Sequence, residues 1–239
     1  EAPWADDLFR ALGARELDVL DNSDYEGARL IHDLNKPLPD DAGGRYDFVF
    51  DGGVIEHVFH ASVAWQTCMR LARTGGHVCS CSIANNECGH GFYQFSPEFL
   101  FANFNASTGF EILSSVLLEE SKPSRWFEVR NPEDVGSRVC LINHHPTLIL
   151  ALVRKAEARQ VDKPPLQSDY VSVWGNESTA YDQTGGGVKK SVRSLTDLLP
   201  AGLKLWLIRQ YRRHYVETTR NRTFYRRIDK AGFTIPVRA

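Results

Sequence analysis

Apolar and polar residues alternate along the first 155 residues in patterns that predict helices and strands in turn. Apolar residues three and four positions apart are typical of helices, whereas short apolar runs bounded by turn residues are typical of strands. The predicted helices cover residues 6–13, 61–72 and 98–104. The predicted strands cover residues 17–21, 28–35, 47–50, 77–83, 109–118 and 146–153. Strands that alternate with helices indicate an α/β fold.

The segment 46–57 is the part of the sequence on which the functional prediction depends most. Residues 47–50 read as a buried strand, which the Asp-Gly-Gly sequence at 51–53 ends. Two adjacent glycines let a backbone turn sharply and approach a ligand closely. Glu56 and His57 follow where a helix would begin. Two ionisable side chains therefore lie just past the carboxyl end of a strand, where open α/β sheets bind their ligands.

Composition limits the possible functions without selecting one. The 239 residues suffice for one domain with a full core and an appendage, and the formal net charge of -2 gives no general reason to expect a nucleic-acid partner. No apolar run is long enough to span a bilayer, and we expect a cytoplasmic protein. The five cysteines, an odd number, fit a reducing compartment with buried thiols.

Two sequence patterns carry a resemblance to a known family. The sequence at 46–58, YDFVFDGGVIEHV, resembles the end of the fourth strand in class I S-adenosylmethionine-dependent methyltransferases, where a pattern like fD-x-V-x-x-x-x-v-L-E-H-V is common. Residues 71–78 follow that family's L-R-P-G-G-x-hydrophobic pattern, with Thr74 in place of proline. The resemblance covers residues 6–153. It implies a Rossmann-like, doubly wound, mostly parallel sheet with an antiparallel last strand.

The resemblance also implies how S-adenosylmethionine would be bound. Asp21, followed by Asn22, matches the acid that accepts hydrogen bonds from both ribose hydroxyls, which suits a carboxylate with two acceptor oxygens. The alternative is a turn-initiating aspartate in Asp-Asn-Ser. Asp33 matches the polar residue that meets the adenine amine, and Leu34 the apolar residue that covers the ring. The turn after the central strand completes the cofactor set with Asp51, Gly52 and Gly53.

Methyl transfer to an oxygen atom needs a base that removes its proton or a metal that lowers its pKa. The candidate bases are His57, His90 and His144. The candidate Mg²⁺ ligands are Asp51, Glu56 and His57, because hard cations prefer carboxylates and tolerate imidazole. Helix capping and packing beneath the cofactor are the alternative for Glu56 and His57, and an ordinary surface position is the alternative for His144.

The segment 85–97, NNECGHGFYQFSP, combines amides, glycines and aromatic residues after a predicted strand. Amides and aromatic faces suit recognition of a polar ring such as a saccharide. The alternative is a loop that packs its aromatic residues over the sheet edge. The connection 119–145 is expected at the rim of the same site. The candidate substrate-binding residues are Asn85, Asn86, Tyr93, Gln94 and Trp126.

One feature of the family is not found in residues 1–20. The family's first strand carries a G-x-G-x-G turn that passes beneath the methionine part of the cofactor, and no such motif occurs there. Two explanations stay open: the turn belongs to a segment outside this sequence, or the first strand has been lost.

The composition changes after residue 155, so we divide the chain into a methyltransferase domain, 1–155, and an extension, 156–239. Residues 163–166, Lys-Pro-Pro-Leu, read as a linker, and residues 181–190 are expected to be mobile or disordered. A basic amphipathic helix is predicted across 198–227. It could dock on the domain, join two copies into a homo-oligomer, or lie on an acidic membrane.

The predicted function is transfer of a methyl group from S-adenosylmethionine to a hydroxyl of a saccharide or another polar small molecule. A second prediction is an inactive, methyltransferase-like binding or scaffold protein. An RNA methyltransferase is a third, suggested by the basic extension, although nucleic acid is otherwise not expected. A dinucleotide-binding Rossmann-type enzyme would require a Gly-rich first turn.

Overall fold

The computed structural model describes residues 5–24, 27–159, 164–168 and 199–232. Its elements in chain order are α1 (Asp6–Ala11), β1 (Leu20–Asp21), β2 (Leu30–Ile31), η1 (Asp40–Ala42), β3 (Tyr46–Asp51), η2 (Ile55–His57), α2 (Ala61–Leu71), β4 (Ala72–Asn85), α3 (Pro97–Asn103), η3 (Ala106–Thr108), β5 (Phe110–Glu119), β6 (Arg125–Val129), α4 (Pro132–Val135), β7 (Thr147–Lys155), α7 (Ala201–Tyr211), η4 (Arg212–Val216), β8 (Tyr225–Arg227) and η5 (Lys230–Gly232). Each helix and strand predicted before residue 155 is present, and the fold is α/β as expected.

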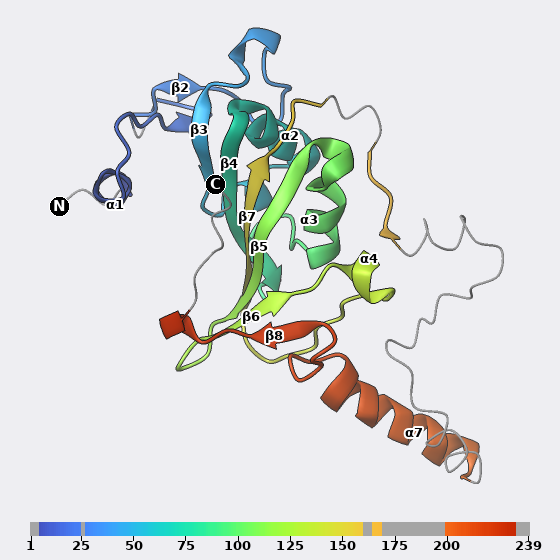
Figure 1. Ribbon diagram of the computed structural model, residues 1–239. Coiled ribbons are helices and arrows are strands. Elements are labelled where there is room, and N and C mark those ends of the chain that lie inside the picture. The colour runs from blue at the N-terminus through green and yellow to red at the C-terminus, as the bar shows by residue number, and fades with distance from the viewer. Residues whose placement is uncertain (1–4, 25–26, 160–163, 169–198, 233–239) are drawn as a thin grey trace.

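A six-stranded mixed sheet in the order β3-β4-β7-β5-β6-β8 forms the centre of the molecule (Figure 1). Strands β3 and β4 run parallel, whereas β7 runs antiparallel to both of its neighbours, β4 and β5. The pairs β5–β6 and β6–β8 are also antiparallel, so the expectation of a mostly parallel sheet is wrong for this sheet. Strand β7 corresponds to the strand predicted at 146–153, and β8 follows it in the chain and joins the same sheet. Strands β1 and β2 form a separate parallel pair.

Helix α2 connects β3 to β4 and packs on the sheet, as a crossover between parallel strands must. Its central residue, Trp65, is 1% exposed. The indole ring meets three aromatic rings at centroid distances of 5.6–5.7 Å, those of Phe95, Phe99 and Phe104. Strand β7 alternates buried and half-buried residues, as expected for a strand covered on one face. The main core therefore lies between the sheet and the face of α2 that packs on it.

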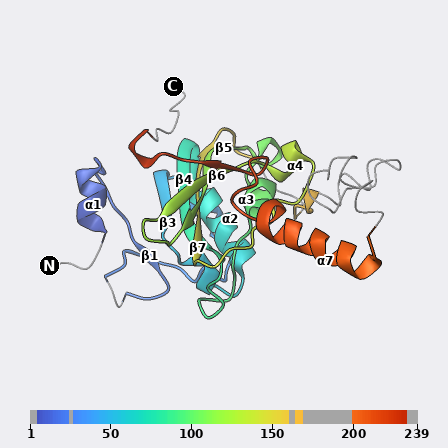
Figure 2. The same cartoon turned by 90° about the horizontal axis from the view of Figure 1, so that it is seen from below.

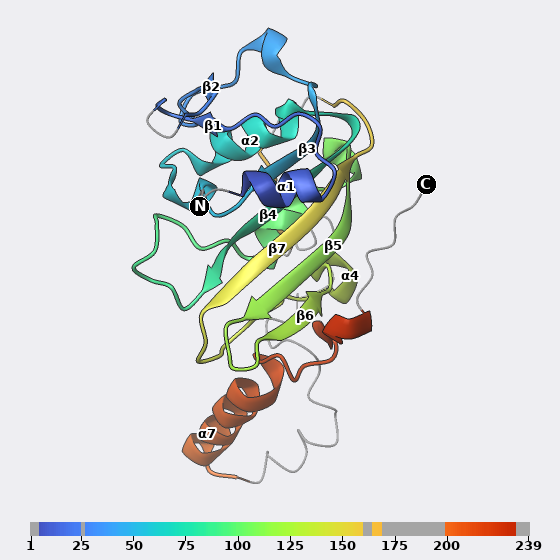
Figure 3. The same cartoon turned by 90° about the vertical axis from the view of Figure 1, so that its left-hand side faces the viewer.

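The helices are distributed unevenly over the two faces of the sheet. Helices α2, α3 and α4 lie behind the sheet in Figure 3, whereas α1 lies in front of it beside β3. The Phe9 ring of α1 contacts the rings of Phe48 and Phe50 on β3. Among the described residues, α1 is thus the helix that covers the second face.

The C-terminal part differs from the single helix predicted across 198–227. Helix α7 continues through η4 and ends at Val216, and the chain then returns as β8, which pairs with β6. The prediction is wrong after residue 216 because Phe224 and Tyr225 are buried against the core. Helix α7 projects away from the sheet in Figures 1 and 2. Residues 181–190 and the predicted helix start at 198 lie outside the described residues.

Strand β8 belongs by sequence to the predicted extension, yet it completes the main sheet. The division at residue 155 stays a prediction. In the described part of the chain, no helix has both the length and the apolar character needed to cross a bilayer.

Candidate functional site

Asp51 fixes the carboxyl end of β3. Its Oδ1 accepts hydrogen bonds from the backbone N–H groups of Val54 and Ile55, at 3.0 and 3.3 Å. Its Oδ2 accepts hydrogen bonds from the hydroxyls of Ser80 and Ser82 on β4, at 2.7 and 3.4 Å. The carboxylate is 4% exposed. Because four donors occupy its acceptor positions, Asp51 ties β3, η2 and β4 together, and it is not a member of the group of possible metal ligands that contains Glu56 and His57.

The two glycines after Asp51 allow the turn to lie close to its neighbours. Gly53 has a φ of +93°, and a Cβ there would lie 3.2 Å from Oε1 of Glu56. A Cβ at Gly52 would lie 2.8 Å from the ring of Phe50. The sequence predicted a close approach of this turn to a ligand, whereas the contacts that the structure shows are with Phe50 and Glu56 of the same chain.

Glu56, His57 and His90 form a cluster that the sequence predicted in part. Their ligating atoms all lie within 4.8 Å of one another. The two histidine Nε2 atoms are 3.2 Å apart, and Nε2 of His90 is 3.9 Å from Oε1 of Glu56. Glu56 is 1% exposed, while both histidines are exposed. The structure thus brings two of the three predicted bases together, whereas His144 is exposed and not a member of the cluster.

The backbone of Glu56 holds the segment after β4 against η2. Its carbonyl oxygen accepts hydrogen bonds from the N–H groups of Phe92 and Tyr93, at 2.7 and 3.3 Å. Gly91 has a φ of +69°, and a Cβ there would lie 2.7 Å from the same oxygen. Both the conformation and the close approach therefore require glycine at this position. This contact sets the position of His90 relative to His57.

The segment after β2 reaches the same edge of the molecule. Oδ1 of Asn35 accepts a hydrogen bond from the backbone N–H of His60 at 3.0 Å. Asp33 accepts hydrogen bonds from the backbone and side chain of Asn35, and the backbone bond is the main reason that the pKa of Asp33 is lowered. Leu34, predicted to cover the adenine, packs against the core.

The segment after β1 carries the predicted ribose-binding residue. Asp21 lies beside Ile31 in the parallel register, so its carboxylate is at the end of the β1–β2 pair. Oδ1 of Asp21 accepts a hydrogen bond from the N–H of Ser23 at 2.9 Å, as in the turn that the sequence left as the alternative. Asn22 is exposed.

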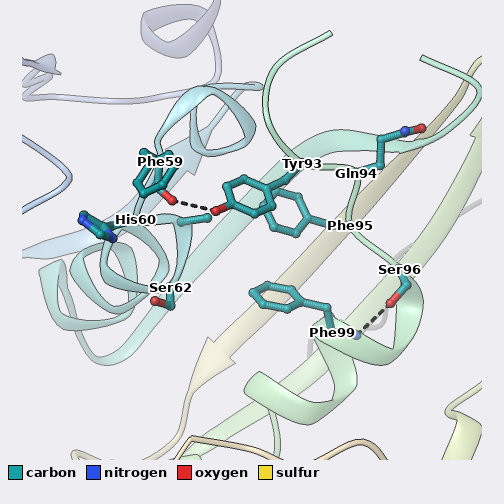
Figure 4. A pocket seen from close by; sticks show the side chains of 9 residues that line it. Phe59, His60, Ser62, Tyr93, Gln94, Phe95, Ser96 and Phe99 are labelled. Carbon is teal, nitrogen blue, oxygen red and sulfur yellow. Dashed lines mark hydrogen bonds between the residues drawn. The ribbon is translucent and has the colours of Figure 1, made fainter. Parts of the chain in front are cut away.

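An open pocket of about 500 Å³ lies between the segments that follow β3 and β4. Its lining residues are Phe59, His60, Ala61, Ser62, Tyr93, Gln94, Phe95, Ser96 and Phe99 (Figure 4). The hydroxyl of Tyr93 donates to the carbonyl oxygen of Phe59 at 2.7 Å, and the Tyr93 ring stacks on that of Phe95. Two predicted substrate-binding residues, Tyr93 and Gln94, therefore line this pocket. Phe59 and Phe99 were not predicted, although aromatic residues close to His57 and Tyr93 were a usable signal.

The other predicted substrate-binding residues do not line the pocket. The side-chain amides of Asn85 and Asn86 donate to Oδ1 of Asn143, and that of Asn86 also to the carbonyl oxygen of His145. These amides anchor the segment before β7. Trp126 lies on β6, which β4, β7 and β5 separate from β3 in the sheet, and its ring is 5.4 Å from Nζ of Lys230.

Comparison of the chain with protein-family models, with curated proteins and with solved structures gave no significant match. The resemblance to class I methyltransferases therefore rests on residues 46–58 and 71–78 and on the order of the strands. The chemistry of the site has to be derived from the residues that the fold brings together.

Proposed function

We propose that the chain is an S-adenosylmethionine-dependent methyltransferase that methylates a hydroxyl of a saccharide or another polar ring compound. One observation carries this proposal: the segments that follow β2, β3 and β4 are joined by hydrogen bonds at one edge of the molecule. Asn35, after β2, contacts His60, after β3, and Glu56, after β3, contacts Phe92, after β4. Ligands of open α/β sheets bind at this edge.

The arrangement of strands supports the proposal. The parallel unit β3-α2-β4 and the insertion of β7 antiparallel between β4 and β5 are two features that the proposed fold requires, whereas β1 and β2 form a parallel pair outside the six-stranded sheet. The two acids assigned to the nucleoside lie at the ends of the paired strands β1 and β2. Asp21 is the last residue of β1, and Asp33 follows the end of β2. One nucleoside could then contact both acids.

Each proposed residue role follows from its chemistry. S-adenosylmethionine, when bound, supplies an activated methyl group. Asp21 and Asp33 accept hydrogen bonds from its ribose and adenine. The aromatic rings of Phe59 and Tyr93 hold the acceptor ring, because flat apolar faces suit sugars and aromatic rings. The exposed His57, two residues before the pocket residue Phe59, takes up the hydroxyl proton as the oxygen attacks.

The residues gathered at this edge do not fit Mg²⁺. This ion prefers a shell of oxygen ligands. The oxygens of Asp51 are engaged by four protein donors, and the remaining cluster offers two imidazoles and one carboxylate. We therefore derive no step through Mg²⁺.

Calorimetric titration with S-adenosylhomocysteine tests the proposal. We expect one binding site per chain. Replacing Asp21 by alanine should weaken binding by roughly 10- to 100-fold, the value of one or two hydrogen bonds to a charged acceptor. Asp24→Ala, which removes an exposed acid from the same loop, should leave the affinity unchanged. Tight binding that Asp21→Ala does not alter would contradict the ribose assignment, and no binding at all would contradict the proposed function.

A binding or scaffold protein is the second candidate, and the edge of the sheet favours it. Strand β3 is the terminal strand of the six-stranded sheet, and its Phe48 and Phe50 are 44% and 48% exposed. Sheet edges with exposed apolar residues accept added strands from partners. This candidate predicts no thermal shift of the protein with S-adenosylmethionine.

A further inference from the structure

We infer that Glu56, His57 and His90 bind one divalent transition-metal ion such as Zn²⁺. The three residues come from two segments, η2 and the segment after β4, which are distant in sequence. Their ligating atoms lie within 4.8 Å of one another, and the Nε2 atoms of the histidines are 3.2 Å apart. This site differs from the predicted Mg²⁺ set in both residues and chemistry, because His90 takes the place of Asp51.

The distances suit a tetrahedral ion. Bonds of about 2.0–2.2 Å from zinc to nitrogen or oxygen place neighbouring ligand atoms about 3.3–3.6 Å apart. The spacing between His57 and His90, 3.2 Å, is close to this value. The spacing from Nε2 of His90 to Oε1 of Glu56 is 3.9 Å, and ligand atoms within the set are up to 4.8 Å apart, so binding requires the exposed histidine side chains to move toward Glu56.

The burial of Glu56 is an independent observation that points to a cation. The residue is 1% exposed, and its Oε2 has no hydrogen-bond partner within the described residues. A buried carboxylate is unfavourable unless donors or a cation satisfy its oxygens. The other oxygen, Oε1, lies 3.9 Å from Nε2 of His90, so an ion bound between the carboxylate and the imidazoles would offset the burial of the group.

The backbone around the cluster fixes the ligands before any ion binds. The carbonyl oxygen of Glu56 holds Phe92 and Tyr93, and Gly91 lies directly against it. The segment that carries His90 is therefore attached to the residue next to His57. A site that is already assembled loses little conformational entropy when an ion enters.

The ligand types determine which metals fit. Two imidazoles with one carboxylate favour zinc and similar transition metals over Mg²⁺ or Ca²⁺. Three protein ligands leave the fourth position of a tetrahedral ion open for water or an acceptor hydroxyl. In the proposed methyltransferase, the metal would lower the pKa of that hydroxyl so that its proton passes to solvent, in place of proton uptake by His57, and only this consequence rests on the proposed function.

Titration of the full chain with Co²⁺, after removal of bound metal with a chelator and dialysis, tests the inference. We expect one Co²⁺ per chain with the visible absorption of a tetrahedral site, displaced by Zn²⁺ but not by an excess of Mg²⁺ of about 1,000-fold. His90→Ala and Glu56→Gln should each weaken binding by about 100-fold or more, since each removes one of three ligands. His214→Ala removes an exposed histidine on η4 and should leave binding unchanged.

Two outcomes would overturn the inference. Binding that persists in His90→Ala would indicate scattered surface histidines, and no Co²⁺ or Zn²⁺ binding would leave His57 and His90 as a metal-free hydrogen-bonded pair. His90 is exposed, so its variant is expected to fold even if Glu56→Gln does not, and circular dichroism checks this. Calorimetry with S-adenosylhomocysteine on His90→Ala separates the two proposals, because nucleoside binding should be retained when metal binding is lost.

Discussion

Helices α2 and α7 are both eleven residues long and rich in apolar side chains, yet their environments are opposite. Helix α2 buries most of its residues against the sheet, whereas α7 buries none. In α2 the buried residues share one side of the helix, around Ala64, Trp65 and Cys68. In α7 the apolar residues Leu203, Leu205, Trp206 and Leu207 surround the axis and are exposed.

The difference shows that connectivity, as well as apolar content, decides what a helix packs against. Helix α2 lies in the connection between β3 and β4, which pair in parallel, so the helix has to cross the sheet. Helix α7 has no such constraint and leads through η4 toward the edge strand β8. The candidate site lies on the α2 side, where the segments between strands are held by many contacts.

The largest difference between the two helices should appear in the free energy of unfolding when the tryptophan of each helix is replaced by alanine. Trp65→Ala should lower the free energy of unfolding by about 3–5 kcal/mol, because it removes a buried ring that packs on three others. Trp206→Ala should change it by less than about 0.5 kcal/mol, since Trp206 is 55% exposed. Urea unfolding measures both values, and similar losses would mean that α7 is packed in solution.

Replacing one glycine near the candidate site and one in α7 by alanine should give the next largest difference in the free energy of unfolding. Gly91→Ala should lower the free energy of unfolding by about 2 kcal/mol or more, because the left-handed backbone is strained and the new Cβ meets the carbonyl oxygen of Glu56. Gly202→Ala lies in α7 with open space around it and should not destabilise the protein. Equal free energies of unfolding for Gly91→Ala and wild type would contradict the close contact between the two loops.

Alkaline pH should reveal the burial of α2 through Cys68. Burial raises the pKa of its thiol to about 12, whereas the unfolded thiol has a value near 9.0. Above pH 9 the unfolded chain binds fewer protons than the folded one, so the free energy of unfolding falls as pH rises. Between about pH 8 and pH 10, Cys68 alone should account for a loss of about 1.3 kcal/mol.

The matched variants for this pH effect are Cys68→Ala and Cys88→Ala. Unfolding in urea at both pH values should show a smaller loss in Cys68→Ala and the wild-type loss in Cys88→Ala, because Cys88 is exposed. An unchanged loss in Cys68→Ala would show that its thiol is accessible in the folded protein.

The sequence predicted the elements of the sheet well where apolar runs were uniform and poorly where charged residues interrupt a strand. Residues 46–51 and 147–155 are strands that the apolar pattern indicated. Strands β6 and β8 have the sequences RWFEV and YRR. Their charged residues interrupt the apolar pattern by which a strand is recognised in a sequence. The helix predicted to 227 failed for the same reason.

The site was predictable where its residues follow strands and unpredictable where partners are distant in sequence. Glu56, His57 and Tyr93 lie near strand ends, so their meeting followed from the topology. The structural role of Asn86 depends on Asn143, which is 57 positions away. No local pattern reveals such a pair, and the amide was consequently assigned to substrate.

Hydrogen–deuterium exchange with and without S-adenosylhomocysteine tests the central claim, that the tips of successive strands bind one nucleoside. The account predicts slower exchange in residues 21–23, 33–35 and 51–57 when the nucleoside is present, and unchanged exchange in α7. Unchanged exchange in all three segments at saturating nucleoside, or protection confined to α7, would contradict it.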